Sequence, residues 1–262
     1  MSKFQEGDWV LACDKKHRQR MFVIRKGKLF SLYNKQFKHD ILIGLEEGSA
    51  LFADSSQPVY VFRPSMRDYV MNMKRNVQPI YPKDLGLMVF YADLRPGSKV
   101  LEIGLGAGAL SLAILNAIGP SGELITYERR QDFAKQGKDR IEAFLGICDN
   151  HKVVIRDASE SIDEKGFDSA FIDVPEPWSV VENVCNSVKN GAYVMAFIPT
   201  TVQIKQYWDF VDKMRCVSQV EIFETMFRKW DVGRRSLRPA HTMIGHTGFV
   251  VVFRKVSLAE KV

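Results

Sequence analysis

A glycine-rich turn is the clearest sign of chemistry in this sequence. Residues 102–109 read EIGLGAGA and stand where an apolar segment ends and a helical segment begins. Glycines at such a junction permit a tight turn and let a ligand approach the backbone beside a helix N-terminus. The spacing is G-x-G-x-G, which differs from the G-x-G-x-x-G of dinucleotide-binding proteins. A tight turn in any α/β protein would look similar, but the acidic residue that closes the next strand favours a cofactor site.

Acidic residues end the three apolar segments that follow this turn. Glu128 ends ELITYE, twenty residues after Gly108, where a carboxylate can accept hydrogen bonds from ribose hydroxyls. Asp157 ends KVVIRD, and Asp173 ends FDSAFID. Residues just past the carboxyl ends of parallel strands line the ligand crevice, so we expect Asp173 to face a bound cofactor. An aspartate after a strand often only caps a helix, but the place of Asp157 in this series favours a functional role.

Alternating strands and helices must position these residues. The expected strands are KVLEIG, ELITYE, KVVIRD, FDSAFID and AYVMAFIP, and the expected helices are 109–118, 131–145, 179–189 and 202–214. This alternation predicts βαβ units with right-handed crossovers in a mainly parallel sheet. Two further strands, 217–227 and 248–254, have no helix between them, so one of them should run antiparallel at the edge. The predicted fold is α/β, with a doubly wound seven-stranded sheet of the Rossmann-like type.

A small β domain precedes this fold. Five short apolar segments, WVLAC, MFVIR, LFSLY, ILIG and PVYVF, are separated by polar or glycine-containing turns and predict a partial barrel. Residues 65–75 predict a helix with Ser65 as its N-cap. The expected domains are therefore a β domain at 1–63, a helical connector at 64–96 and a cofactor-binding domain at 97–262.

Composition and charge narrow the function only slightly. The chain has 262 residues, of which 46% are hydrophobic and 26% charged, and this balance excludes disordered and low-complexity classes. The net charge of +6 suits a polyanionic partner without requiring one. The basic run at 15–20 fits a solvated loop as well as a nucleic-acid contact. A second basic cluster lies before the last strand and consists of Arg228, Lys229, Arg234, Arg235 and Arg238. Its place beside the expected site favours a contact with RNA over an exposed hairpin.

Metal, redox and membrane signals are weak. The four cysteines form no C-x-x-C pair, so we expect free thiols, with disulfides left open. His241 and His246 lack metal-ligand partners at useful spacing, and no metal is expected. No signal-peptide pattern or apolar span stands out, so we expect a cytoplasmic protein without a membrane segment.

Four segments together resemble the tRNA adenine-N1 methyltransferase family, which makes 1-methyladenosine in the T-loop. These segments are QPIYPKD at 78–84, the glycine turn at 102–110, DVPEPW at 173–178 and GHTGF at 245–249. The turn together with Glu128 also resembles the motifs of class I S-adenosylmethionine-dependent methyltransferases in general. The likeness to the tRNA family covers nearly the whole chain.

This resemblance implies a cofactor, a substrate and an assembly. S-adenosylmethionine would be bound, without a metal, and tRNA would be methylated at adenine-58, with adenine-57 left open. A homotetramer is also implied. Asp173 matches the catalytic carboxylate, Tyr81 an aromatic residue bordering the methyl-transfer site, and Phe197 a tyrosine that can contact the target adenine. The cofactor residues implied are Glu102, Gly104, Leu105, Gly106, Ala107, Gly108, Ala109, Glu128, Phe133, Asp157 and Asp173.

The expected chemistry suits a carboxylate. N1 of adenine already has an in-plane lone pair, so alignment of the reactants matters more than removal of a proton. A carboxylate that accepts a hydrogen bond from the exocyclic amine would orient the base and favour the developing positive charge. Phe197 lacks the hydroxyl of the family tyrosine, although its ring can still stack on a base.

Two other functions stay open at this point. A class I methyltransferase that acts on a protein carboxylate or a small tetrapyrrole would share the glycine turn and Glu128. A non-catalytic tRNA-binding subunit is a different class of protein. The intact turn and Asp173 argue against this second alternative.

Overall fold

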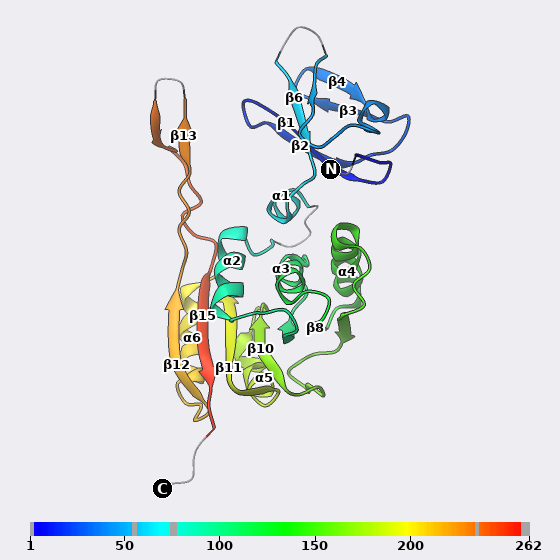
Figure 1. Ribbon diagram of the computed structural model, residues 1–262. Coiled ribbons are helices and arrows are strands. Elements are labelled where there is room, and N and C mark those ends of the chain that lie inside the picture. Colours follow the sequence, from blue (N-terminus) through cyan, green and yellow to red (C-terminus); the bar gives the residue numbers. More distant parts are fainter. Residues whose placement is uncertain (1–2, 54–56, 74–77, 234–235, 258–262) are drawn as a thin grey trace. The chain divides into compact units, whose positions relative to one another are not determined.

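The computed structural model describes residues 3–53, 57–73, 78–233 and 236–257 (Figure 1). The chain divides into two compact units, residues 1–74 and 75–262. The helical connector expected at 64–96 is therefore shared between them, since its first helix packs with the first unit and its second helix with the second.

The first unit is built from two small antiparallel sheets. One has the order β2-β1-β6-β5 and the other pairs β3 with β4. The strands are β1 Trp9–Asp14, β2 Gln19–Val23, β3 Leu29–Leu32, β4 Lys35–Lys38, β5 Ala50–Leu51 and β6 Val59–Phe62. Buried side chains from both sheets form one core, with Phe4, Val10, Ile24 and Phe30 at most 1% exposed. A small N-terminal β region is thus confirmed.

The prediction of a strand at ILIG is wrong for the first two residues of this segment. His39–Leu42 forms the 3-10 helix η1 instead. His39 Nδ1 accepts the Arg25 N–H at 3.0 Å, and Asp40 Oδ2 accepts the Gly27 N–H at 3.0 Å. These two side chains satisfy a neighbouring turn while Leu42 enters the core, and a helical turn allows both.

Helix α1, Met66–Asn72, begins as the sequence predicts. Ser65 Oγ accepts the Asp68 N–H at 3.2 Å, and Asp68 Oδ2 accepts the Ser65 N–H at 3.1 Å, which makes a capping box. The helix ends at Asn72, short of Arg75, which lies outside the described residues. Its Tyr69 packs edge-on against Trp9 of β1 with ring centroids 5.3 Å apart, so α1 belongs to the first unit.

A seven-stranded sheet in the order β12-β15-β11-β10-β7-β8-β9 forms the centre of the second unit. Its strands are β7 Lys99–Ile103, β8 Glu123–Glu128, β9 His151–Ile155, β10 Phe167–Ile172, β11 Val188–Ile198, β12 Val217–Phe223 and β15 Phe249–Lys255. Strands β7 to β11 pair in parallel, and β15 pairs antiparallel with both β11 and β12. This confirms the expected mainly parallel sheet, and the antiparallel strand β15 lies one position in from the edge.

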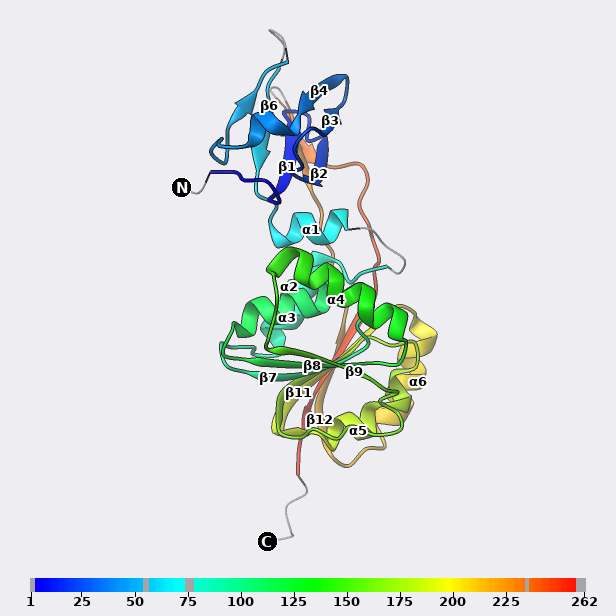
Figure 2. The same ribbon diagram turned by 90° about the vertical axis from the view of Figure 1, so that its right-hand side faces the viewer.

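Helices cover both faces of this sheet. Helices α2, α3 and α4 lie on one face, and α5 and α6 lie on the other (Figure 2). Their bounds are α2 Pro82–Tyr91, α3 Ala109–Ile118, α4 Gln131–Leu145, α5 Val181–Cys185 and α6 Thr201–Val211. Strands β7, β10 and β15 are mostly buried because helices cover both faces of the sheet there, whereas the edge strands β12 and β9 are largely exposed or half-buried. The helix expected at 179–189 is shorter, because Val188 already pairs with Phe167 at the start of the longer strand β11.

A two-stranded arm extends from the sheet between β12 and β15 (Figure 1). It contains β13 Trp230–Val232 and β14 Leu237–Pro239, paired antiparallel. We use "the arm" for residues 224–247. The strand expected at 217–227 therefore ends earlier, at Phe223, where the chain leaves the sheet. None of the helices described is long and apolar enough to cross a membrane.

Candidate active site

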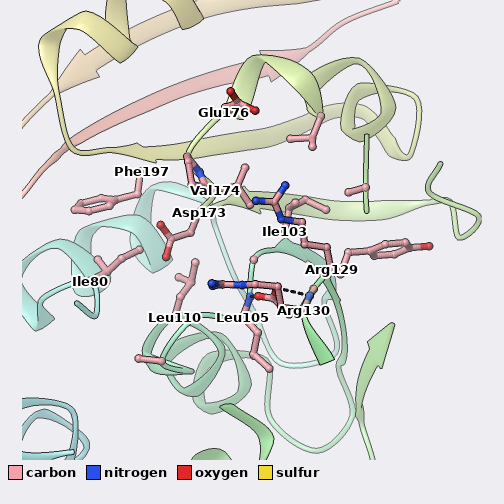
Figure 3. Close-up of a pocket in the computed structure, with 18 of the residues that line it drawn as sticks. Ile80, Ile103, Leu105, Leu110, Arg129, Arg130, Asp173, Val174, Glu176 and Phe197 are labelled. Atoms are coloured by element: carbon pink, nitrogen blue, oxygen red, sulfur yellow. Dashed lines mark hydrogen bonds and ion pairs between the residues drawn. The ribbon is translucent and has the colours of Figure 1, made fainter. Parts of the chain in front are cut away.

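A cavity of about 710 Å³ opens beside the carboxyl ends of β7, β8, β10 and β11 (Figure 3). This volume lies within the range of small-molecule sites, and the place is where open α/β sheets bind ligands. The structure brings nine of the predicted site residues together in its lining: Gly104, Leu105, Gly106, Ala107, Ala109, Glu128, Asp157, Asp173 and Phe197.

The glycine turn joins two strand ends closely. The Asp173 N–H donates to the Ile103 carbonyl at 2.8 Å, which brings the ends of β10 and β7 together. Gly104 has φ +91°, and a Cβ there would lie 2.3 Å from the Asp173 carbonyl oxygen. Only glycine fits this position, because a side chain would separate the two strand ends. The turn then leads into α3, whose first residues lie at the cavity.

Glu128 presents a nearly buried carboxylate to the cavity. Its Oε2 accepts the Leu105 N–H at 3.2 Å, and its Oε1 accepts the Arg130 N–H at 2.9 Å. Each carboxylate oxygen can accept more than one hydrogen bond, so both keep capacity for ligand hydroxyls. This geometry suits the ribose contact that the sequence predicts.

Glu102 lies beneath the turn rather than in the cavity lining, and it is fully buried. Its Oε2 accepts hydrogen bonds from Ser111 Oγ at 2.6 Å and Thr126 Oγ1 at 2.7 Å. Its Oε1 has no hydrogen-bond partner among the residues described. Burial raises the pKa of Glu102 to about 8, although the bonds from Ser111 and Thr126 oppose the rise. Such an unsatisfied buried oxygen is exceptional in proteins.

Asp173 points its carboxylate into the cavity toward Leu110 (Figure 3). Burial, and then the negative charge of Glu128, raises the pKa of Asp173 to about 7. No residue in the described part of the chain donates a hydrogen bond to this carboxylate. A cavity carboxyl with a strongly raised pKa is typical of functional sites.

Asp157 belongs both to a turn and to the cavity lining, and its predicted contact with the cofactor stays a prediction. Its Oδ1 accepts hydrogen bonds from the Ser159 N–H at 2.9 Å and the Ser159 hydroxyl at 2.8 Å, so it caps a turn. These bonds keep the pKa of Asp157 below its usual value. The residue also lines the cavity, with Oδ2 3.8 Å from the Arg129 guanidinium.

The aromatic candidates differ in position. Phe197 lines the cavity, and its ring lies against Gly248. Tyr81 is the N-cap of α2, directly after Pro79 and Ile80, which line the cavity. Phe133 lies on α4, with the Arg130 guanidinium 3.2 Å from its ring centroid. Tyr81, Phe133 and Gly108 are outside the cavity lining, and their predicted roles stay predictions.

Several lining residues were missed from the sequence. Arg129 and Arg130 directly follow Glu128, and Arg156 precedes Asp157, so their places next to strand ends were the available signal. Of the basic cluster, Arg228, Lys229 and Arg238 lie exposed on the arm rather than in the lining. Arg234 and Arg235 lie outside the described residues.

None of the four cysteines is among the described residues that line the cavity. Cys13, Cys148, Cys185 and Cys216 are free thiols. Among the described residues, no three histidine, cysteine or acidic side chains gather in a way that could hold a metal ion. The expected independence from metal stays a prediction.

The fold and the site define an S-adenosylmethionine-dependent methyltransferase of class I. A similar crystal structure is a SAM-dependent O-methyltransferase from Thermotoga maritima, with a TM-score of 0.93 and 27% identity over 99% of this chain and 97% of that chain. The tRNA (m1A58) methyltransferase TrmI from Aquifex aeolicus gives a TM-score of 0.88 and 27% identity over 98% of this chain and 100% of that one.

Sequence comparison narrows the class to a family. The model of the family described as tRNA methyltransferase complex GCD14 subunit matches residues 57–247, and a TrmI-like N-terminal model matches residues 3–51. A curated relative in Methanocaldococcus jannaschii, tRNA (adenine(57)-N(1)/adenine(58)-N(1))-methyltransferase TrmI, is 30% identical over 90% of this chain and 94% of its own length. The chain therefore belongs to this tRNA methyltransferase family, and the family resemblance is confirmed.

Proposed function

We propose that this protein transfers a methyl group from S-adenosylmethionine to N1 of adenine-58 in the T-loop of tRNA. One observation carries the proposal within the family. Asp173 presents a carboxylate that no described residue hydrogen-bonds, in a cavity at the carboxyl ends of the strands. An acceptor left open in this way suits the exocyclic amine of an adenine.

The residues of the cavity fit the cofactor. When bound, S-adenosylmethionine supplies a methyl group on a positively charged sulfur. Glu128 can accept hydrogen bonds from ribose hydroxyls while the Leu105 and Arg130 N–H groups hold it in place. The carboxylate of Asp173, with that of Glu128 beside it in the cavity, favours a cationic ligand over an anionic one.

Asp173 then orients the target base. By accepting a hydrogen bond from the N6 amine, it aligns N1 with the methyl group and stabilises the positive charge that develops on the ring. The adenine must leave its stack in the folded tRNA to reach the cavity, at a cost of a few kcal/mol. Stacking on Phe197 and phosphate contacts from the basic residues of the arm offset this cost.

The test is methyl transfer from labelled S-adenosylmethionine to an unmodified tRNA transcript, with nucleoside analysis of the product. We expect 1-methyladenosine in the T-loop, and a fall of at least about a hundredfold in the Asp173→Ala variant. Transcripts with guanine at position 57 or 58 assign the methylated adenine. A wild-type protein that binds tRNA and cofactor but makes no 1-methyladenosine would refute the proposal.

A second candidate is methylation of a small molecule or a protein carboxylate. The similarity to the Thermotoga maritima protein, which is named an O-methyltransferase, favours it. Methyl transfer in the absence of RNA, to small acceptors or to protein, would support this alternative. The non-catalytic subunit is disfavoured because both the glycine turn and Asp173 are intact.

We also propose a homotetramer that acts in the cytoplasm. The arm exposes large apolar side chains, and such a group of exposed apolar residues is typical of an interface: Met226, Phe227, Trp230, Val232 and Leu237. Native mass spectrometry should give about four times the 29.9 kDa chain mass. The tRNA substrate supports the cytoplasm as the place of action.

A further inference from the structure

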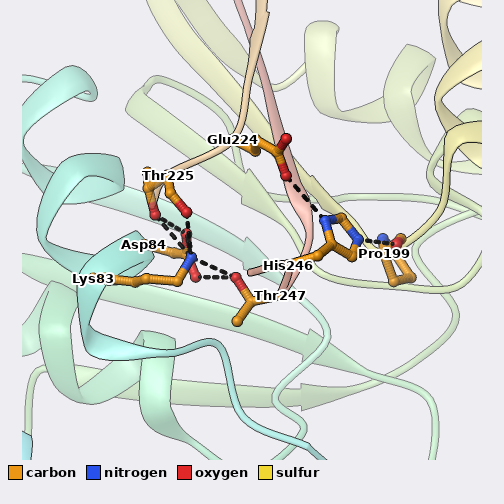
Figure 4. A network of polar contacts seen from close by, with 7 residues as sticks. All are labelled: Lys83, Asp84, Pro199, Glu224, Thr225, His246 and Thr247. Atoms are coloured by element: carbon orange, nitrogen blue, oxygen red, sulfur yellow. Dashed lines mark hydrogen bonds and ion pairs between the residues drawn. The ribbon is translucent and has the colours of Figure 1, made fainter. Parts of the chain in front are cut away.

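A polar network joins helix α2 to both ends of the arm (Figure 4). Asp84, in the first turn of α2, is fully buried, and Lys83 beside it is mostly buried. Lys83 Nζ lies 2.9 Å from Asp84 Oδ1. Thr225, two residues after β12, and Thr247, two residues before β15, complete the network.

Every charge in this network is satisfied. Lys83 Nζ donates to the Thr225 carbonyl at 2.8 Å and to Thr247 Oγ1 at 2.6 Å. The Thr225 hydroxyl donates to Asp84 Oδ1 at 2.6 Å, and the Thr247 hydroxyl donates to Asp84 Oδ2 at 2.8 Å. A buried ion pair is tolerated only with such complete hydrogen bonding, so the two threonines can take one arrangement relative to α2.

The network borders both the cavity wall and the arm. Tyr81 precedes Lys83 by two residues, and Pro79 and Ile80 just before it line the cavity. On the other side of the arm's base, His246 bonds to the Pro199 carbonyl at 2.9 Å and to Glu224 at 3.1 Å.

Pro199 links this base to the second wall of the cavity. It lines the cavity two residues after Phe197. The arm is therefore attached at its base to two walls of the site, one formed by residues 78–80 and the other by residues 197–199.

We propose that Lys83, Asp84, Thr225 and Thr247 form a latch that sets the orientation of the arm relative to the cavity. This inference rests on the proposed tRNA methylation. The basic residues of the arm grip the tRNA, and the latch converts that grip into a defined position of the adenine beside Asp173. The four residues are positioning residues, because none of them lines the cavity.

The test removes the hydroxyls and keeps the shape. The double variant Thr225→Val/Thr247→Val removes both hydroxyls that bond to Lys83 and Asp84 and leaves the ion pair and the Thr225 carbonyl in place. Thr225→Ser/Thr247→Ser is the matched control that keeps both hydroxyls. The single-turnover rate of methyl transfer at saturating tRNA and the dissociation constant of S-adenosylmethionine are measured, well below the unfolding temperature of each variant.

The valine variant should lose at least about tenfold in rate, because small misplacements of reacting groups cost this much or more. Its cofactor affinity should stay within about twofold of the wild type, and the serine variant should recover most of the rate. An unchanged rate, or a loss of cofactor affinity parallel to the loss of rate, would overturn the latch.

Two further results are possible, a valine variant that does not fold and a wild-type protein that makes no product. If the valine variant does not fold, Lys83→Met/Asp84→Leu replaces the buried pair with apolar groups, and the same loss of rate at unchanged cofactor affinity is expected. If the wild-type protein makes no 1-methyladenosine, the proposed function fails and the latch fails with it. If the wild-type protein makes 1-methyladenosine and the variants are as active as the wild type, only the latch is overturned.

Discussion

At the scale of single residues, the site is defined by carboxyl groups whose protonation the protein has altered. The pKa of Asp173 is raised to about 7 and that of Glu102 to about 8, in both cases mainly by burial. Glu128, held by two backbone N–H groups, adds negative charge beside Asp173. Each group can gain from a cationic ligand, because positive charge favours the ionised form of a neighbouring carboxyl.

Activity should rise with pH as Asp173 ionises. The ionised carboxylate is the form that accepts a hydrogen bond from the adenine amine, so methyl transfer is lost as pH falls through the pKa. The midpoint should lie at or below about 7, because the bound cation lowers the pKa of Asp173 in the complex. The measurement is kcat/KM for tRNA between pH 5 and 8.5. Asp173→Asn should be slow at every pH, and a wild-type rate that falls as pH rises would contradict the assignment.

Asp173 should also lower the free energy of unfolding of the ligand-free protein at neutral pH. Its folded-state pKa lies above the ordinary 3.8, so the folded protein binds a proton between these values that the unfolded chain does not bind. The free energy of unfolding therefore falls as pH rises from about 4 to 7. Thermal unfolding should give Asp173→Asn a higher Tm than the wild type at pH 8, with the difference shrinking toward pH 4. Equal values at pH 8 would count against the raised pKa.

At the scale of elements, the start of β15 supports the end of β11. A Cβ added to Gly248 would lie 2.4 Å from the Phe197 ring, so glycine allows this aromatic side chain to take its place in the cavity wall. The same short stretch carries His246 and Thr247, which hold the base of the arm. This short segment before β15 thus serves the cavity and the arm together.

Gly248→Ala should displace Phe197. We expect a loss of about 1–3 kcal/mol in the free energy of unfolding, as for overpacking, together with slower methyl transfer. Gly245→Ala is the matched control, since nothing lies within 4 Å of a Cβ at that position. Adding Phe197→Leu to Gly248→Ala should recover stability without recovering activity. Calorimetry and the tRNA assay separate the two effects, and equal stability of the two alanine variants would contradict the contact.

At the scale of the whole molecule, the second unit combines a cavity lined by both carboxylates and guanidinium groups with a basic arm. The exposed basic residues of the arm are Arg228, Lys229 and Arg238. The cavity holds the carboxylates of Glu128, Asp157 and Asp173, and three arginines lie at the strand ends beside them: Arg129, Arg130 and Arg156. The net charge of +6 is therefore distributed so that a polyanion and a cationic cofactor can bind at different places.

Removal of the arm's positive charge should weaken tRNA binding selectively. Arg228→Gln/Lys229→Gln should lower tRNA affinity and reduce the salt dependence of log K by about 0.7–0.9 per lost phosphate contact. Cofactor affinity should not change, because neither residue lines the cavity. Lys205→Gln on α6, which breaks an exposed pair with Asp209, is the control. Filter binding at several salt concentrations measures the slope, and an unchanged slope in the arm variant would exclude these two contacts.

The local patterns of this protein could be predicted from its sequence. The order of apolar and helical segments predicted the alternating strands and helices, and helices α3 and α4 have the predicted bounds. The glycine spacing and the acidic strand ends pointed to part of the cavity lining, namely most of the glycine turn with Glu128, Asp157 and Asp173. A parallel sheet gathers the carboxyl ends of its strands at one edge, which brings these residues together. These features depend on neighbours in the chain and on a general rule of the fold.

Which distant polar groups meet depends on the strand order of the folded sheet. Lys83 and Asp84 could not be paired with Thr225 and Thr247 from the sequence, because these residues are separated by more than half of the chain and meet only through the strand order. Gly248 acquires its role from the same cause, since β15 inserts beside β11. A buried charge is stable only with partners that the fold supplies. The role of such a residue therefore cannot be predicted from its neighbours in the sequence.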